Sequence, residues 1–174
     1  PSVQMLYYRK DLFESPIWRR MYYEQFKKEL APPKTFEEFN RIASFFTKTI
    51  NPSSPVDYGA TITLGSTGVA GSEYSDTALL ALKEMTALKP CTAPEYCSWW
   101  TNTAARFADG NYAMSLLYSN YAGDLLSPSS KIAGKIGCTM VPGDNPVIGG
   151  GSLGIFRYSK QPEEALSFIK WICS

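Results

Sequence analysis

The side chains that enzymes use most often for proton transfer and nucleophilic attack are scarce in this sequence. It contains no histidine, which excludes Ser-His-Asp and Cys-His catalysis, histidine metal ligands and histidine pH switches. The acidic residues fall mostly on predicted helix faces, without a pair typical of glycosidases. We therefore expect no catalytic residue, no metal site and no cofactor.

The cysteines are the remaining reactive groups. Cys91 and Cys97 are six residues apart, a spacing that a disulfide in a short loop could close. They do not form a C-x-x-C pair, and no histidine or second pair completes a zinc site. A zinc site is therefore disfavoured, while a structural disulfide and free buried thiols both remain open. The other two cysteines are Cys138 and Cys173.

Three glycines near the C-terminus spell G-x-G-x-x-G, the pattern of dinucleotide-binding turns: Gly149, Gly151 and Gly154. A dinucleotide site needs a helix that begins directly after the pattern. Here the sequence IFRYS follows, and it predicts a strand. A tight turn is therefore favoured, with a loop whose backbone groups meet a ligand as the alternative.

Aromatic residues make up 14% of the chain, and several lie outside the predicted helix stripes. Trp99 and Trp100 are adjacent, so on a helix they cannot face the same way, and one of them could be exposed. Tyr118 and Tyr121 follow the apolar segment AMSLL, with Asn120 between them. Rings that stack on a sugar beside amide and hydroxyl groups are typical of carbohydrate sites. Ordinary core packing of these rings is the alternative interpretation.

These residues must be positioned by elements that the hydrophobic pattern predicts. Short alternating or apolar runs predict strands at 3–8, 58–64, 113–117, 135–140 and 153–156. Helical periodicity predicts helices at 16–30, 35–48, 75–88, 98–108, 120–126 and 162–173. Two helix starts are marked clearly, by Ser15 before Pro16 and by a capping box from Thr35 to Glu38. Because strands alternate with helices, the sequence predicts an α/β fold.

Length and charge narrow the class of protein further. The chain has 174 residues and a net charge of +1, so a buried core is possible and no nucleic-acid surface is expected. No apolar run is long enough for a membrane span. The chain begins at Pro1 without a methionine, and its last residues, FIKWICS, carry no helix stop signal. We therefore expect a fragment of a longer protein.

Six segments, taken in order, resemble the extracellular solute-binding proteins of ABC transporters, in the carbohydrate-binding group that includes maltose-binding protein. The segments are MLYYRKDLF (5–13), PPKTFEEF (32–39), DYGAT (57–61), FADGNYAMSL (107–116), VPGDNPVIGGGSLGI (141–155) and SKQPEEALSFIKWI (159–172). The resemblance covers nearly the whole chain. Each motif is weak alone, and six in the same order are fairly specific.

The resemblance implies two α/β lobes with a ligand in the cleft between them. This chain would supply mainly the second lobe, a periplasmic-binding-protein-like (type II) lobe with a mixed sheet flanked by helices. Residues 1–8 would form the crossing, or hinge, strand and residues 9–142 the second-lobe domain. Residues 143–174 would form the return strand and a helix of the first lobe. The first half of the first lobe and the C-terminal helices would be missing.

The resemblance also implies positions that contact a ligand. Tyr8 matches a family tyrosine at the crossing that can stack on sugar, although Arg9 replaces the usual asparagine. Where the family often reads Gly-x-Trp, this chain has Tyr118, Ser119 and Asn120, followed by Tyr121. The family's glycine loop at the cleft corresponds to Gly149, Gly150, Gly151 and Ser152. With Trp100 from the aromatic pattern and Asn120 and Tyr121 after the strand, Tyr8, Tyr118 and these glycine-loop residues form the expected ligand-binding set.

The function implied is that of a non-catalytic carrier. It would bind a sugar or oligosaccharide outside the membrane, close about a hinge and deliver the ligand to an ABC permease. The resemblance implies a periplasmic or lipid-anchored protein, monomeric when full length, without a nucleic-acid partner. Two alternatives stay open: an extracytoplasmic sensing domain of a receptor or regulator, and a carbohydrate-active enzyme. The enzyme would need two carboxylates about 5–9 Å apart in a cleft.

Overall fold

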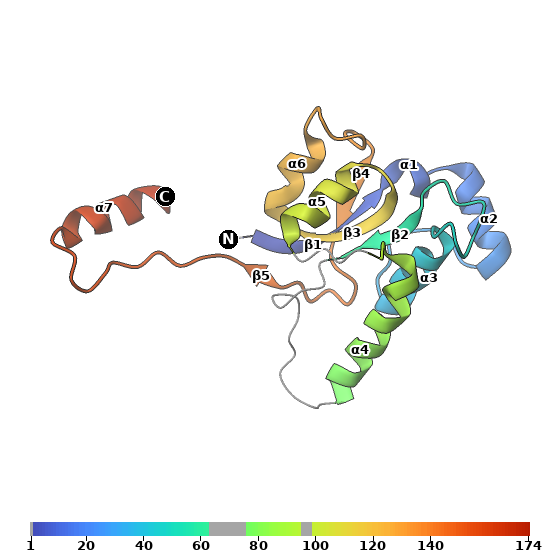
Figure 1. Ribbon diagram of the computed structural model, residues 1–174, viewed down its shortest axis with the longest axis horizontal. Helices are drawn as coiled ribbons and strands as arrows, with labels where there is room; N and C mark the ends of the chain where they lie inside the picture. Colours follow the sequence, from blue (N-terminus) through green and yellow to red (C-terminus); the bar gives the residue numbers. More distant parts are fainter. Residues whose placement is uncertain (1, 63–75, 95–98) are drawn as a thin grey trace.

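The computed structural model describes residues 2–62, 76–94 and 99–174, which form an α/β lobe (Figure 1). The described part contains a mixed five-stranded sheet. Its strands are β1 (Ser2–Arg9), β2 (Tyr58–Thr61), β3 (Tyr112–Tyr118), β4 (Ile136–Thr139) and β5 (Ile148–Gly149). Its α-helices are α1 (Lys10–Phe13), α2 (Pro16–Phe26), α3 (Phe36–Phe45), α4 (Asp76–Leu88), α5 (Trp100–Ala108), α6 (Ala122–Leu126) and α7 (Pro162–Ile172), and its 3-10 helices are η1 (Lys89–Cys91) and η2 (Ser119–Tyr121). The predicted α/β class is confirmed.

The sheet is built around β1, which pairs on both of its edges. Leu6 lies opposite Leu116 of the antiparallel strand β3 on one side and opposite Thr139 of the antiparallel strand β4 on the other. β2 extends the sheet beyond β3 and runs parallel to it, giving the order β2-β3-β1-β4, while β5 pairs with the first residues of β1. Residues 1–8, for which the resemblance implies a crossing strand, thus correspond to β1, the central strand of the described sheet.

Successive residues of β1 point into two hydrophobic cores, one on each face of the sheet. Leu6 belongs to the core that α1, α2 and α3 cover. Tyr7 faces the opposite core, to which α5 contributes Phe107. Many of the aromatic residues lie in the first core, where the rings of Tyr22 and Phe45 meet edge to face with centroids 5.1 Å apart. These contacts are the favourable geometry for aromatic pairs.

Two helices end earlier than their apolar patterns predict. α2 ends at Phe26, not at residue 30, because Lys27 adopts a left-handed conformation with a φ of 55°. α3 ends at Phe45, not near residue 48. Beyond it, the Thr47 hydroxyl donates to the Ala43 carbonyl (2.7 Å) and accepts from the Gly59 N–H (3.0 Å). This hydroxyl therefore ties the end of α3 to β2.

The predicted helix starts are confirmed, with one difference at the capping box. The Glu38 N–H donates to Thr35 Oγ1 (3.2 Å), while the Glu38 carboxylate accepts from the N–H of Lys34 (2.8 Å), one residue before the expected partner. Ser15 precedes α2 and Pro16 begins it, although the Ser15 side chain makes no capping hydrogen bond. The four-residue helix α1 was not predicted, because so short an element shows no periodicity.

The strand predicted at 153–156 is wrong. Residues 150–156 have no regular secondary structure and pair with no described strand. The pairing occurs earlier, in β5, where Gly149 lies opposite Ser2 and Ile148 opposite Val3. β3 already pairs with β1 from Gln4 onward and β4 from Leu6 onward, so only the first residues of β1 accept a further strand. Part of the strand predicted at 58–64 and the start of the helix predicted at 75–88 lie outside the described residues.

The described cysteines are free thiols. Cys91 is fully buried, with its Sγ 3.5 Å from the Oγ of Ser44. Cys138 and Cys173 are free and exposed, and Cys97 lies outside the described residues. Of the two alternatives, a free buried thiol is therefore the one that applies to Cys91. Within the ranges that the structure describes, no group of three histidine, cysteine or acidic residues could hold a metal ion.

The chain after β5 leaves the body of the lobe and ends in α7, which lies apart from the sheet (Figure 1). Large apolar side chains along this stretch are exposed, among them Phe156 at 74% and Trp171 at 71%. So many exposed large apolar side chains in one stretch of chain are typical of a region that packs against another structure. None of the helices in the described ranges combines the length and the apolarity of a membrane span.

Candidate ligand-binding site

The carboxyl ends of the parallel strands β2 and β3 mark one edge of the sheet. In open α/β sheets, ligands bind outside the carboxyl ends of the strands. β3 ends at Tyr118, and η2 follows directly, so Asn120 and Tyr121 lie at this edge. β1 begins at the same edge, since Gln4 lies opposite Tyr118. The structure therefore brings together three of the predicted site residues.

Tyr118 is the centre of an aromatic cluster at this edge. Its ring packs nearly perpendicular to the Trp100 indole at the start of α5, with centroids 4.8 Å apart. The same ring lies against the backbone of Gly149, where a side-chain carbon would come within 2.7 Å of Tyr118 Cε1. Trp99 is 55% exposed, so of the two adjacent indoles one packs and one faces solvent. The structure thus adds Trp100 and Gly149 to the set.

The other predicted residues at this edge are accessible. Asn120 is exposed, and Tyr121 is half-buried against the second hydrophobic core, to which Trp100 also packs. Gly150, Gly151 and Ser152 follow β5 and are exposed, and a side-chain carbon at Gly151 would meet nothing within 4 Å. The edge therefore offers aromatic faces beside an amide and open backbone, groups that suit a neutral polyhydroxylated ligand.

Ser119 is a residue of this edge that the sequence analysis did not select. Its Oγ accepts a hydrogen bond from the N–H of Val3 (3.2 Å), which joins η2 to the first residues of β1. The only signal in the sequence is its place between Tyr118 and Asn120. A serine in a loop is too common to be chosen on that ground.

Tyr8 lies apart from the other predicted residues. It pairs with Met114, four residues along β1 from Gln4, which corresponds to about 13 Å at about 3.3 Å per residue. Its ring packs on Phe13, with centroids 5.0 Å apart, and covers Gly137, where a side-chain carbon would lie 2.4 Å from Tyr8 Cζ. The structure does not bring Tyr8 to the cluster around Tyr118.

Arg9, which stands where the family usually has asparagine, is used within the lobe. Its Nε and Nη2 donate to the two carboxylate oxygens of Asp11 (2.8 and 2.7 Å), and its Nη1 donates to the Gly110 carbonyl (2.7 Å). Burial tends to raise the pKa of the Asp11 carboxyl, but the hydrogen bonds and charge of Arg9 outweigh it and hold that pKa below its usual value. This guanidinium therefore links the end of β1 that is remote from Tyr118 to Asp11 and to the Gly110 backbone.

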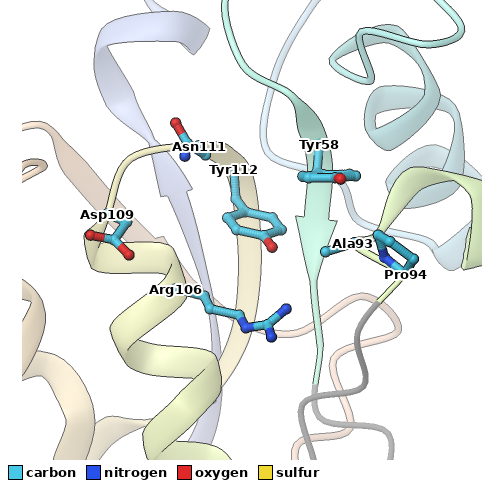
Figure 2. Close-up of a pocket in the computed structure, with 7 residues that line it drawn as sticks. All are labelled: Tyr58, Ala93, Pro94, Arg106, Asp109, Asn111 and Tyr112. Carbon is cyan, nitrogen blue, oxygen red and sulfur yellow. The ribbon is translucent and has the colours of Figure 1, made fainter.

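A cavity of about 320 Å³ lies at the opposite end of β3 (Figure 2). The rings of Tyr58 and Tyr112 stack at its wall, with centroids 5.4 Å apart, and Arg106 extends from α5 toward it. The other lining residues are Ala93, Pro94, Asp109 and Asn111. Tyr112 is six residues from Tyr118 along β3, or about 20 Å. The cavity thus lies at the amino ends of the parallel strands, the end that ligands of such sheets do not use.

The family model of the bacterial extracellular solute-binding proteins matches residues 2–174. The chain belongs to this family. Members are non-catalytic binding proteins, so the enzyme alternative is set aside for this chain. Their family description places them outside the cytoplasm. No curated protein matches the sequence significantly.

Solved structures of solute-binding proteins share the fold. MalE3 of T. maritima with bound maltose matches with a TM-score of 0.73 and 22% identity, over 99% of this chain and 48% of that chain. An ABC transporter solute-binding protein of Thermotoga lettingae with bound alpha-D-tagatose matches with a TM-score of 0.70 and 21% identity, over 99% and 48%. A third, from Agrobacterium radiobacter with ribitol, has a TM-score of 0.68 and 23% identity, over 99% and 47%. The chain thus spans about half the length of these proteins.

Proposed function

We propose that this chain supplies the second lobe of a receptor that binds a sugar or sugar alcohol outside the membrane and passes it to an ABC permease. The observation that carries the proposal is the ring pair of Trp100 and Tyr118, followed by Asn120 and Tyr121 in η2, at the carboxyl edge of the parallel strands. Family membership supports the receptor role, and the ligands named for the structural neighbours support the ligand class.

The chemistry of the edge favours a neutral ligand with both apolar and hydroxyl surfaces. Tyr121 would offer its ring to the C–H face of a sugar, and the Asn120 amide would pair with hydroxyl groups. Tyr8 is not assigned a ligand contact, because its ring is engaged by Phe13 and Gly137. The backbone of residues 150–152 would meet the ligand from the far side once the lobes close.

Residues 143–174 are proposed to belong to the first lobe, and β1 with β5 to form two of the crossings. The exposed apolar side chains of this region support the assignment, because they need a partner surface. On α7 these include Phe168 at 53% and Trp171 at 71% exposure. The remaining parts of the proposal are closure about the crossings, delivery to a permease, and a periplasmic or lipid-anchored location.

The test is a thermal-shift screen of the full-length gene product against sugars and sugar alcohols, with amino acids and peptides as controls. A ligand at 100 times its dissociation constant stabilises the folded state by about 2.7 kcal/mol, which raises the melting temperature by several degrees. A shift with sugars only is expected. A shift with peptides or amino acids only would refute the ligand class.

Two tyrosine variants then test the site. Tyr121→Ala is expected to weaken sugar binding about tenfold, the loss for an aromatic contact worth about 1.4 kcal/mol. Tyr23→Ala is the matched control, because Tyr23 is 53% exposed on α2, away from the cluster. Equal affinities of the two variants for the sugar in isothermal titration calorimetry would show that the ligand does not bind at this edge.

A further inference from the structure

Three stretches of chain that are distant in sequence meet at Tyr118 and Ser119. The first is the beginning of β1, where the Val3 N–H donates to Ser119 Oγ (3.2 Å). The second is β5, where the Tyr118 ring lies against the Gly149 backbone. The third is η2, which carries Asn120 and Tyr121 and starts at Ser119 itself. Tyr118 and Ser119 therefore contact β1, by which the chain enters the lobe, and β5, by which it leaves. They also adjoin the turn η2, which carries the proposed ligand contacts.

The two outer stretches also hold each other. Ser2 and Val3 pair with Gly149 and Ile148, and the Gln4 N–H donates to the carbonyl of residue 147 (2.9 Å). The pairing between β1 and β5 ends at Gly149. A side-chain carbon at Gly149 would lie 2.7 Å from the Tyr118 ring and 3.2 Å from Ser2 Oγ, whereas one at Gly151 would meet nothing. The chain that leaves the lobe is therefore packed tightly at Gly149, whereas among the described residues nothing packs where a side chain at Gly151 would lie.

We propose that Tyr118 and Ser119 are positioning residues that clamp both strand crossings to the turn carrying the ligand contacts. This inference rests on the proposed function and assigns roles within that site. The clamp makes residues 2–4 and 147–149 move with this lobe as one body, so that bending during closure falls outside them, from Gly150 onward. A ligand that displaces Asn120 or Tyr121 thereby acts on the crossings through a neighbouring residue.

The geometry explains why each residue is suited to its part. Ser119 offers a small hydroxyl that accepts the Val3 N–H, a backbone group that β3 does not reach because its pairing with β1 begins at Gln4. Tyr118 is held by the Trp100 indole at 4.8 Å, which fixes its ring over the glycine. Only glycine allows the backbone to approach the ring so closely. The clamp therefore depends on a hydroxyl at 119 and on the absence of a side chain at 149.

The first test needs no ligand and uses hydrogen exchange of the full-length gene product. Ser119→Ala should accelerate exchange of the Val3 amide about 2- to 12-fold, as expected for the loss of one neutral hydrogen bond. Ser119→Thr keeps the hydroxyl and should restore the protection. Unchanged exchange in Ser119→Ala would overturn the part of the clamp that Ser119 supplies.

A glycine pair tests the ring contact in the same assay. Gly149→Ala should reduce the protection of residues 2–4, because the new methyl group collides with Tyr118, while Gly151→Ala should leave that protection intact. The double variant Gly149→Ala with Tyr118→Leu should recover part of the loss, because the shorter side chain gives room. Equal protection in the two glycine variants, or no recovery in the double variant, would overturn the ring contact.

Closure is read by fluorescence energy transfer between dyes on the two lobes, with the sugar found in the screen. Ser119→Ala lets the crossings bend within residues 2–4 and should lower the apparent affinity and the closed fraction together, by at most the roughly 2- to 12-fold that one hydrogen bond is worth, or about 0.5–1.5 kcal/mol, and Ser119→Thr should reverse both. An altered Val3 exchange with unaltered closure would overturn the coupling role. If the wild type binds no sugar, the proposed function fails, and the exchange results alone decide whether the clamp exists.

Discussion

Gly59 of β2 is the position where a single methyl group should do most damage to the lobe. The backbone of α3 runs directly over this glycine, and a side-chain carbon at Gly59 would lie 1.8 Å from the Ala43 carbonyl oxygen and 2.4 Å from its carbonyl carbon. Both distances are far below the ordinary contact distance of about 3.5–4.0 Å between carbon atoms. Gly59→Ala therefore forces the helix and the strand apart.

The magnitude follows from which atoms collide. Inserting a methyl group into a packed core costs about 1–3 kcal/mol when side chains can adjust. Here the obstacle is backbone, so no rotamer change relieves it, and separation would also break the hydrogen bond from the Gly59 N–H to Thr47 Oγ1. We expect a loss of about 3 kcal/mol or more, which lowers the melting temperature of a domain of this size by about 6–12 °C.

The assay is thermal and urea unfolding of the full-length gene product, with two further variants. Gly123→Ala in α6 is the matched control, because a side-chain carbon there meets nothing within 4 Å, and it should be neutral or slightly stabilising. Adding Ala43→Gly to Gly59→Ala should not restore stability, since the collision is with the carbonyl and not with the side chain. A Gly59→Ala protein that melts within a degree of the wild type would refute the reasoning.

Three further predictions concern polar groups. Thr47→Val leaves the Gly59 N–H without its acceptor and should cost about 1–3 kcal/mol in urea unfolding, whereas Thr47→Ser should cost less. Ser115→Ala removes a buried hydroxyl that has no hydrogen-bond partner among the described residues and should leave the urea midpoint unchanged or raised; a clear loss would contradict this. The pKa of the Asp11 carboxyl is lowered by Arg9, so its stabilisation is present above the unfolded value of about 3.9 and lost as pH falls through the folded value. The stability difference between wild type and Asp11→Asn should therefore shrink from pH 5 toward about pH 2.5, and a constant difference would refute it.

Local features of the site could be predicted from the sequence. Tyr118, Asn120 and Tyr121 follow a strand within a few residues, so the strand's apolar pattern was enough to place them at its end. The capping box at Thr35 and Glu38 is local in the same way. Such predictions succeed because the relevant partners lie within one turn or one strand end.

Contacts between distant segments could not be predicted in this way. The hydrogen bond from Val3 to Ser119 joins residues 116 positions apart, and no spacing rule relates them. The separation of Tyr8 from Tyr118 could not be predicted for a related reason: alternation shows which face of the strand Tyr8 occupies, but not how far it lies from Tyr118. The strand predicted at 153–156 has suitable residues, yet a strand also needs an unpaired neighbour, which only the sheet order of β1 reveals.

The central position of β1 in the sheet affects how the protein folds during its synthesis on the ribosome. This apolar strand is made before β2, β3, β4 and β5, yet Leu6 pairs with Leu116, which is synthesised 110 residues later. At a synthesis rate of about 5–20 residues per second, β1 waits about 5–20 s for a neighbour on that edge, and longer for β4. During that interval its backbone groups and its VQMLYY side chains are available for pairing with other chains. The described sheet therefore assembles around β1 only after β3 and β4 have been synthesised, through pairings of long sequence separation.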